Sequence, residues 1–200
     1  MSTEIEIEFK NMVTHDEFLR INQHFSLKNS DFISQENHYF DTKLFSLKKN
    51  NCALRIRRKN NRYELTLKQP AEIGLIETNE IINSEVCNQI LSNGILPDGE
   101  VKMKLMQSNL PFEDISCFGT LTTNRAEIKY LGGLLVFDHS FYLKKEDFEI
   151  EYEVTDREIG KKHFIALMDQ LNIPIRETNN KILRFYNEAL KQKQTSEEEK

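Results

Sequence analysis

The first clear pattern in the chain is an alternation of charged and apolar residues over positions 4–10. Successive side chains of a β-strand point to opposite faces, so the alternation predicts a strand with one charged and one apolar face. The charged face carries Glu4, Glu6, Glu8 and Lys10, and the apolar face carries Ile5, Ile7 and Phe9. Like charges on one strand face repel, so either water or a ligand must use the charged face.

The same two-faced pattern recurs along the chain. Alternation and turn residues predict eight strands, at 4–10, 38–42, 52–59, 63–68, 73–83, 116–131, 134–143 and 147–155. Charged residues share a face in four of the later strands, namely Arg55 with Arg57, Glu64 with Lys68, Arg125 with Glu127 and Lys129, and Glu149 with Glu151 and Glu153. Most of the predicted sheet therefore has one charged face.

Helical patterns fill several of the connections between strands. Thr14 and Glu17 have the spacing of a capping box, which predicts a helix of roughly three turns after the first strand. Further helices, with Ser84 and Asp156 as expected N-caps, are predicted over 84–94, 97–107, 156–171 and about 180–192. Each carries apolar residues at helical spacing and needs an apolar surface to pack on.

These elements predict an α+β fold in which eight antiparallel strands close into a barrel. If the helices pack on the apolar strand faces from outside, the charged faces line the interior. The expected molecule is a tunnel with a polar, charged interior and outer helices. It forms one domain over residues 1–192, followed by an acidic tail at 193–200 that is expected to be disordered.

Composition narrows the class of protein. The 200 residues include thirteen Phe and six Tyr, enough bulky material for a core, and carry a net charge of −5, which argues against nonspecific nucleic-acid binding. No apolar run has membrane-spanning length and no signal region precedes the first strand, so the expected location is cytoplasmic, away from membranes. Three scattered cysteines and five scattered histidines lack the spacing of a disulfide framework or a zinc site.

Within the predicted interior, charges of opposite sign are segregated. Acidic residues dominate the first and last strands, whereas basic residues occupy the strands around Arg55, Lys68 and Arg125. Arg binds phosphate oxygens, and Mg²⁺ or Mn²⁺ bridges phosphate to carboxylate, so this segregation predicts a polyanion such as a triphosphate bound with its divalent cation. For any one strand alone, a solvated sheet face is the alternative.

Several motifs occur in an order that carries a family resemblance. They are the E-x-E-x-K run at 6–10, His-Tyr-Phe-Asp-Thr at 38–42, Ala-Leu-Arg-Ile-Arg at 53–57, the segment 64–70, Arg125, and the Glu-rich strand at 149–153. Together they resemble the CYTH, or triphosphate tunnel metalloenzyme, superfamily over nearly the whole chain. The resemblance implies the same eight-stranded tunnel with outer helices.

The resemblance also implies site residues. Metal would be bound by Glu6 and Glu8 with two of Glu149, Glu151 and Glu153, of which Glu151 and Glu153 are preferred, and Asp138 would support the metal. Phosphate would be bound by Lys10, Arg55, Arg57, Lys68 and Arg125, with Lys181 reaching a tunnel mouth.

Three positions stay open at this point. Tyr39 is either a phenol assisting proton transfer near Lys68 or a half-buried aromatic residue, which is preferred. Asp41 is expected to shape a turn rather than to bind metal. Glu77 and Glu80 cannot both point inward from a regular strand, and the pattern does not decide between them.

The leading functional hypothesis is a divalent-metal-dependent hydrolase of inorganic, thiamine or nucleoside triphosphate. Metal-activated water would cleave the terminal phosphoanhydride, with Glu8 and Lys68 taking part in catalysis. One alternative is a class IV-like adenylate cyclase, which makes cyclic AMP and pyrophosphate. Another is a noncatalytic binder of polyphosphate or a phosphorylated nucleotide. The expected partner is a triphosphate-containing small molecule, and monomer and homodimer are both open.

Overall fold

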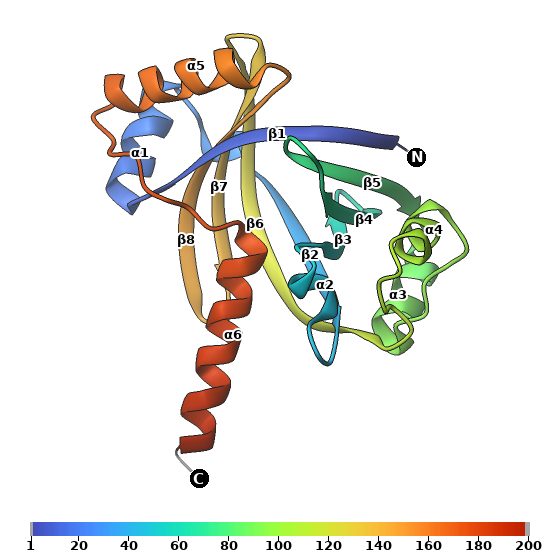
Figure 1. Cartoon of the computed structure of the whole chain (residues 1–200). Helices are drawn as coiled ribbons and strands as arrows, with labels where there is room; N and C mark the ends of the chain where they lie inside the picture. The colour runs from blue at the N-terminus through green and yellow to red at the C-terminus, as the bar shows by residue number, and fades with distance from the viewer. Residues whose placement is uncertain (1, 199–200) are drawn as a thin grey trace.

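Eight antiparallel strands close into a barrel in the computed structural model, which describes residues 2–198 and the side chains of residues 5–192 (Figure 1). The strands are β1 (Ser2–Val13), β2 (Ile33–Thr42), β3 (Ala53–Lys59), β4 (Arg62–Pro70), β5 (Leu75–Ile82), β6 (Ile115–Tyr130), β7 (Gly133–Tyr142) and β8 (Lys145–Val154). Their order around the barrel is β1-β5-β4-β3-β2-β6-β7-β8, and β8 pairs back with β1. The predicted α+β barrel is therefore confirmed.

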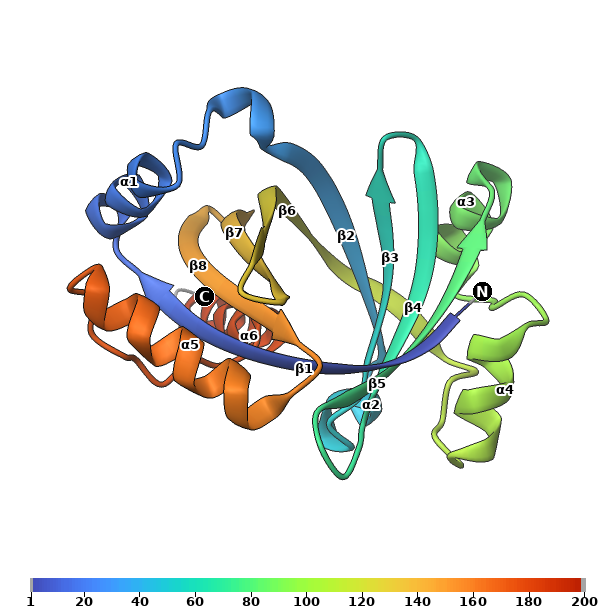
Figure 2. The same ribbon diagram turned by 90° about the horizontal axis from the view of Figure 1, so that it is seen from above.

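Strand β1 closes the barrel by pairing with two different neighbours. Residues 2–6 pair with β5, and residues 7–13 pair with β8. Figure 2 shows β1 as a long strand that runs across the molecule between these two partners. Glu6 and Glu8 consequently lie on either side of the point where β1 changes partner.

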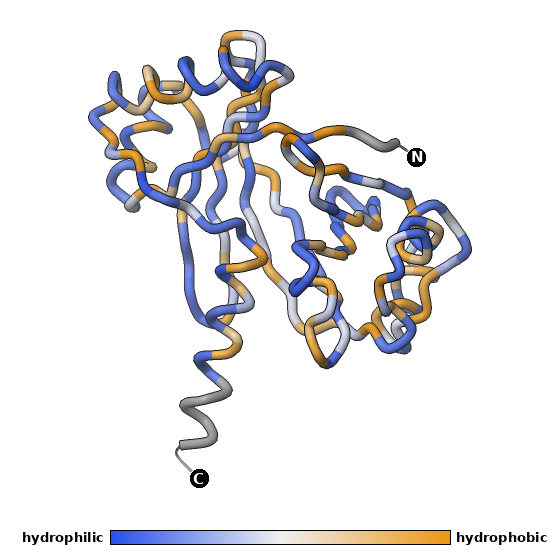
Figure 3. The backbone as a smooth tube through the Cα atoms, in the orientation of Figure 1, coloured by the Kyte–Doolittle hydropathy of each residue, from blue (hydrophilic) through white to orange (hydrophobic). Residues whose placement is uncertain are grey.

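Helices cover the outward apolar strand faces on two sides of the barrel (Figure 2). On one side, α3 (Ser84–Asn93) and α4 (Glu100–Gln107) contact β4 and β5, and on the other, α1 (His15–His24) and α5 (Arg157–Gln170) contact β1 and β8. Ile90 and Leu105 pack with Leu65 in the first core, and Phe18 and Phe164 pack with Ile150 in the second. Figure 3 shows hydrophobic and hydrophilic residues interchanging along the strands, as expected when only the outer face is apolar.

The C-terminal helix α6 (Lys181–Glu198) is anchored to the barrel through its first turns. Phe185 is fully buried among Tyr39, Leu121 and Tyr142. The next residue, Tyr186, stacks on Phe118, with ring centroids 4.4 Å apart. Beyond these contacts α6 extends away from the barrel (Figure 1).

Asp41, at the end of β2, joins α6 to the short helix α2 (Ser46–Lys49). Its buried carboxylate accepts hydrogen bonds from the backbone N–H groups of Leu47 and Lys48, at 2.9 and 3.0 Å, and so caps α2 from a distance. It also accepts a bond of 2.6 Å from the Tyr186 hydroxyl. Burial and this bond raise the pKa of Tyr186. The expectation that Asp41 shapes the turn is borne out.

Several boundaries differ from the sequence expectations. Strand β2 begins at Ile33, five residues before the predicted start, because residues 33–37 pair with the neighbouring strand β6. Asn83, rather than Ser84, is the N-cap of α3, since its side chain accepts from the Val86 N–H. The backbone of α6 is helical to Glu198. The disorder expected for residues 193–200 stays a prediction, and residues 199–200 lie outside the described part.

The apolar face of β1 is covered over only part of its length. Phe9 packs against Phe164 of α5, with ring centroids 6.1 Å apart, as expected. Ile5, in the segment of β1 that pairs with β5, is 67% exposed. In residues 2–198, none of the helices combines the length and apolar character needed to cross a membrane.

We predict that Asp41→Ala lowers the free energy of unfolding by about 3 kcal/mol. The substitution removes the cap of α2 and leaves buried N–H and hydroxyl donors without an acceptor. Tyr186→Phe removes only one of these bonds and should cost about 1 kcal/mol. Urea unfolding at constant pH measures both values. Equal losses in the two variants would contradict the capping role of Asp41.

Candidate active site

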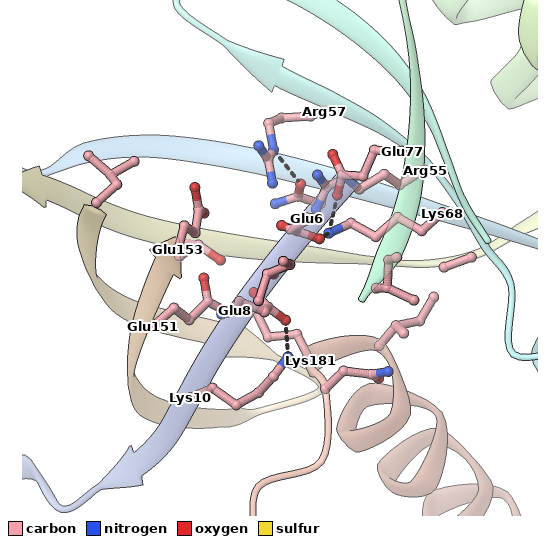
Figure 4. A pocket seen from close by; sticks show the side chains of 18 of the residues that line it. Glu6, Glu8, Lys10, Arg55, Arg57, Lys68, Glu77, Glu151, Glu153 and Lys181 are labelled. Atoms are coloured by element: carbon pink, nitrogen blue, oxygen red, sulfur yellow. Dashed lines mark hydrogen bonds and ion pairs between the residues drawn. The ribbon is translucent and has the colours of Figure 1, made fainter. Parts of the chain in front are cut away.

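The barrel contains a cavity of about 670 Å³ into which the charged strand faces point (Figure 4). Figure 4 shows side chains entering it from β1, β8 and the β3–β5 side of the barrel. The predicted site residues among its lining are Glu6, Glu8, Lys10, Tyr39, Arg55, Arg57, Lys68, Arg125, Glu151, Glu153 and Lys181. The inversion inferred from strand parity, apolar outside and charged inside, therefore describes this barrel.

One wall of the cavity is acidic and is formed where β1 pairs with β8. Glu8 lies opposite Glu153 in the register, and Lys10 lies opposite Glu151. Lys10 forms an ion pair with Glu8. Burial lowers the pKa of Lys10, but Glu8 and Glu151 outweigh it, so that the pKa is raised. This lysine is charged and already has a carboxylate partner.

Lys68 links the acidic wall to β5. Its ammonium lies 2.7 Å from Glu6 and also forms an ion pair with Glu77. Burial raises the pKa of Glu77, but Lys68 and Arg55 outweigh that effect and lower it to about 2. Burial, together with the charges of Glu8 and Glu77, raises the pKa of Glu6 despite Lys68. Lys68 thus joins two carboxylates, one from β1 and one from β5.

Glu153 has no salt bridge to any side chain within residues 5–192. Burial raises its pKa to about 7, with Glu151, Glu6 and Glu8 adding to the rise and Arg125 opposing it. Among the described residues, the salt bridges of Glu6, Glu8 and Glu77 are with Lys10 and Lys68, and Glu153 has none. Four carboxylates and two lysines leave a formal charge of −2, which one divalent cation would balance.

The opposite wall is basic and has the reverse imbalance. Neither Arg55 nor Arg57 forms a salt bridge with a described side chain, and the buried Nε of Arg55 has no hydrogen-bond partner there. Arg57 donates to Asn37 at 3.1 Å. Burial, with the charges of Arg55 and Arg125, lowers the pKa of Arg57 to about 10. The positive charges of this wall are therefore not balanced by salt bridges among the described residues.

A second acidic group consists of Asp138, Glu149 and Glu151, which offer oxygens within 4.8 Å of one another, and Glu151 of this group also lines the cavity. These carboxylates are close enough together to hold a metal ion, but basic side chains already pair with them. Lys181 contacts all three carboxylates, and Arg125 forms a bidentate pair with Asp138 at 2.7 and 2.6 Å. Asp138 and Glu149 are fully buried and do not line the cavity.

The remaining predicted positions are resolved by the strand register. Glu77 points into the cavity (Figure 4), whereas Glu80 points outward and accepts a bond of 2.6 Å from the Glu100 backbone N–H at the start of α4. Tyr39 is 4% exposed and lies opposite Arg55 in the register. Its ring packs beside that of Phe185, as expected for a buried aromatic residue. Its part in proton transfer stays a prediction.

Two contributors were missed by the sequence reasoning. Arg184 contacts Glu149 at 3.0 Å and Asp147 at 2.9 Å. It lies three residues after Lys181, the spacing that places two side chains on one helix face, so the pair was visible in principle. Asn37, which holds Arg57, follows from β2 starting earlier than predicted.

The sequence profile of the CYTH domain matches residues 4–186, and the chain belongs to the CYTH family. This family is metal-dependent, in keeping with the buried acidic groups described above. The chain is 52% identical over 191 residues to the Bacillus subtilis (strain 168) protein named "Putative triphosphatase YjbK", covering 96% of this chain and 99% of that protein.

Solved structures show the same fold. A Bacillus halodurans protein, bh2851, described as "a putative adenylate cyclase", has a TM-score of 0.90 and 41% identity, covering 93% of this chain and all of that chain. The Hippeastrum protein HpAC1, described as a "putative adenylyl cyclase" with a dominant triphosphatase activity, has a TM-score of 0.77 and 23% identity, covering 92% of this chain and 96% of that chain. At 23% identity the likeness concerns the fold alone.

We predict that Glu153→Gln stabilises the metal-free protein at pH 8 and does so less at pH 5.5. A carboxyl whose pKa rises to about 7 on folding contributes stability below its unfolded pKa, and this contribution is lost as the pH rises through 7. The expected gain at pH 8 is about 2–4 °C in Tm. Thermal unfolding in EDTA tests this, with the exposed Glu146→Gln as control. An equal gain at both pH values would contradict the shifted pKa.

Proposed function

We propose that this protein is a divalent-metal-dependent hydrolase that cleaves the terminal phosphoanhydride of a triphosphate. One observation carries the proposal. The cavity has an acidic wall whose carboxylates outnumber the lysines that pair with them, and it faces Arg55 and Arg57, which form no salt bridge with a described side chain. A metal–triphosphate complex supplies both missing charges at once. The 52% identity to a protein named as a triphosphatase supports the same reaction class.

The donor set fits Mg²⁺ or Mn²⁺. Glu6, Glu8 and Glu153 offer carboxylate oxygens, which are the ligands that hard divalent cations prefer. The lining residues of the cavity include one cysteine, Cys52, and no histidine. Burial, with neighbouring carboxylates adding to it, raises the pKa values of Glu6 and Glu153, and a bound cation would favour their charged forms. When bound, the cation would neutralise phosphate charge and lower the pKa of the attacking water.

The chain itself would position the triphosphate. Arg55 and Arg57 present guanidinium groups to the phosphate oxygens, and Asn37 holds the orientation of Arg57. Lys10 and Lys68 would contact the phosphates from the β1 side while keeping their carboxylate partners. A closed sheet holds these groups at fixed separations, which favours in-line attack by water without a covalent enzyme intermediate.

Adenylate cyclase activity is the second candidate, because bh2851, at 41% identity, is described as "a putative adenylate cyclase". Cyclisation places the ribose 3′-hydroxyl against the α-phosphate and requires a binding site for the nucleoside. A turnover panel of inorganic triphosphate, thiamine triphosphate and ATP, each with Mg²⁺ and Mn²⁺, separates the reactions. Orthophosphate marks the hydrolase, and cyclic AMP with pyrophosphate marks the cyclase. Tight binding without any turnover would indicate the noncatalytic alternative.

We predict that Glu8→Ala lowers Mn²⁺-dependent triphosphate turnover by at least ~100-fold. The change removes a metal ligand at the centre of the acidic wall and frees Lys10 from its partner. Glu146→Gln, on the exposed turn side of β8, is the control and should retain activity. Circular dichroism verifies the fold of both variants. Full turnover by a folded Glu8→Ala protein would refute the metal assignment.

Arg57→Ala and Arg58→Ala form a matched pair, since adjacent residues of β3 point to opposite faces. Arg57 faces the cavity, whereas the Arg58 side chain is 50% exposed. We predict that Arg57→Ala weakens triphosphate binding about 10–100-fold and that Arg58→Ala leaves it unchanged. Removing Arg57 also relieves its repulsion by Arg55 and Arg125, so the ligand-free protein should not lose stability. Calorimetric titration and thermal unfolding measure the two effects.

A further inference from the structure

Gln35, near the start of β2, carries a buried hydrogen-bond acceptor that faces the cavity without a partner. The residue is 2% exposed and belongs to the lining of the cavity. Its Oε1 has no hydrogen-bond partner among the described residues. A buried amide oxygen without a donor is costly, so its presence beside a cavity indicates a contact that a ligand or a water completes.

The neutral polar side chains around Gln35 have partners of their own. Asn37, two residues further along the same strand face, accepts a bond of 3.1 Å from Arg57. Thr123 lies opposite Gln35 on β6, and its hydroxyl is 3.2 Å from that of Ser140. These bonds hold the neighbours in place and leave the amide oxygen of Gln35 free.

The strand order places Gln35 across the cavity from the acidic wall. Three strands separate β2 from β1 in either direction around the barrel. Asn37 is the register partner of Arg57, and Gln35 that of Lys59, so Gln35 and Arg57 are diagonal neighbours. Diagonal neighbours on one sheet face are about 7–8 Å apart. A ligand group that reaches Gln35 therefore lies beside a phosphate held by Arg57.

The chemistry of the free acceptor limits what it can bind. Deprotonated phosphate oxygens only accept hydrogen bonds, so they suit the guanidinium groups of Arg55 and Arg57 and not an amide oxygen. Gln35 needs a donor close to the phosphate chain. A nucleoside triphosphate offers ribose hydroxyls beside its α-phosphate. Thiamine triphosphate carries its amino group on the far side of the thiazolium ring, and fully deprotonated inorganic triphosphate has no donor.

We propose that Gln35 is a specificity residue that accepts a hydrogen bond from a ribose hydroxyl of a nucleoside triphosphate. The inference rests on the proposed function, in which the phosphate chain lies between the acidic wall and Arg55 with Arg57. An analogue without the hydroxyl leaves the buried acceptor unpaired, so the contact discriminates against it. Inorganic triphosphate would be held by the charged walls alone.

The test is a cycle of four dissociation constants, measured by calorimetric titration of the full chain with Mg²⁺ present. The ligands are the β,γ-methylene analogues of ATP and of 2′,3′-dideoxy-ATP, which are not cleaved at the terminal linkage. The wild type should bind the ribose ligand about 10-fold more tightly than the dideoxy ligand. Gln35→Met keeps the length of the side chain and removes the amide. It should bind both ligands as the wild type binds the dideoxy ligand.

Ser34→Ala is the matched control, because Ser34 is exposed and points to the opposite face of β2. It should keep the preference for the ribose ligand. Equal binding of the two ligands by the wild type would overturn the inference without any variant and would indicate that water occupies the acceptor. A Gln35→Met protein that keeps the preference, or that binds the dideoxy ligand more weakly than the wild type does, would also overturn it.

The outcome is separable from that of the proposed function. Hydrolysis of inorganic triphosphate, which has no ribose, tests the metal and phosphate sites without the Gln35 contact. If the protein cleaves no triphosphate, the proposed function fails, while the dissociation constants still report on Gln35. If it cleaves triphosphate and binds the two analogues equally, only the specificity inference fails.

Discussion

The cost of burying charge inside a closed barrel is the constraint on which the rest of this structure depends. An ion removed from water must be paired, hydrated or bound to a ligand, or the fold loses stability. The barrel meets this constraint in two ways. Behind the cavity, Asp138 and its neighbours are saturated by cations from β6 and α6. Facing the cavity, Arg57 and Glu153 form no salt bridge with a described side chain. Burial lowers the pKa of Arg57 and raises the pKa of Glu153, so it disfavours the charged form of each.

The same constraint explains why the fold is inverted. Since the charged faces turn inward, the apolar faces must be covered from outside, which is the role of α1 and α5 on one side and α3 and α4 on the other. Closure of the barrel by β1 then has a direct chemical result. The strand that joins β5 to β8 carries Glu6 and Glu8 across the junction, next to carboxylates from both partners.

Strand parity was sufficient to predict much of the site, because a period of two fixes which side chains share a face once the strand is recognised. Glu6, Glu8, Arg55 and Arg57 are of this kind. Parity could not decide between Glu77 and Glu80, since that choice depends on how β5 pairs with β1 and β4. Nor could it show that Lys181 lies among three carboxylates. Lys181 and Glu149 are 32 positions apart in the sequence, and their contact depends on how α6 docks on the barrel.

The two unsaturated walls also imply that metal and polyanion assist each other in binding. The cation alone relieves repulsion among Glu6, Glu8 and Glu153 but leaves the guanidinium groups of Arg55 and Arg57 opposite it without anions. The polyanion alone relieves the arginines but approaches an acidic wall. On the proposed function, each ligand would therefore bind better when the other is present, and by linkage the coupling free energy would be the same in both directions. A site whose charges were already paired, as around Lys181, would have no such coupling to offer.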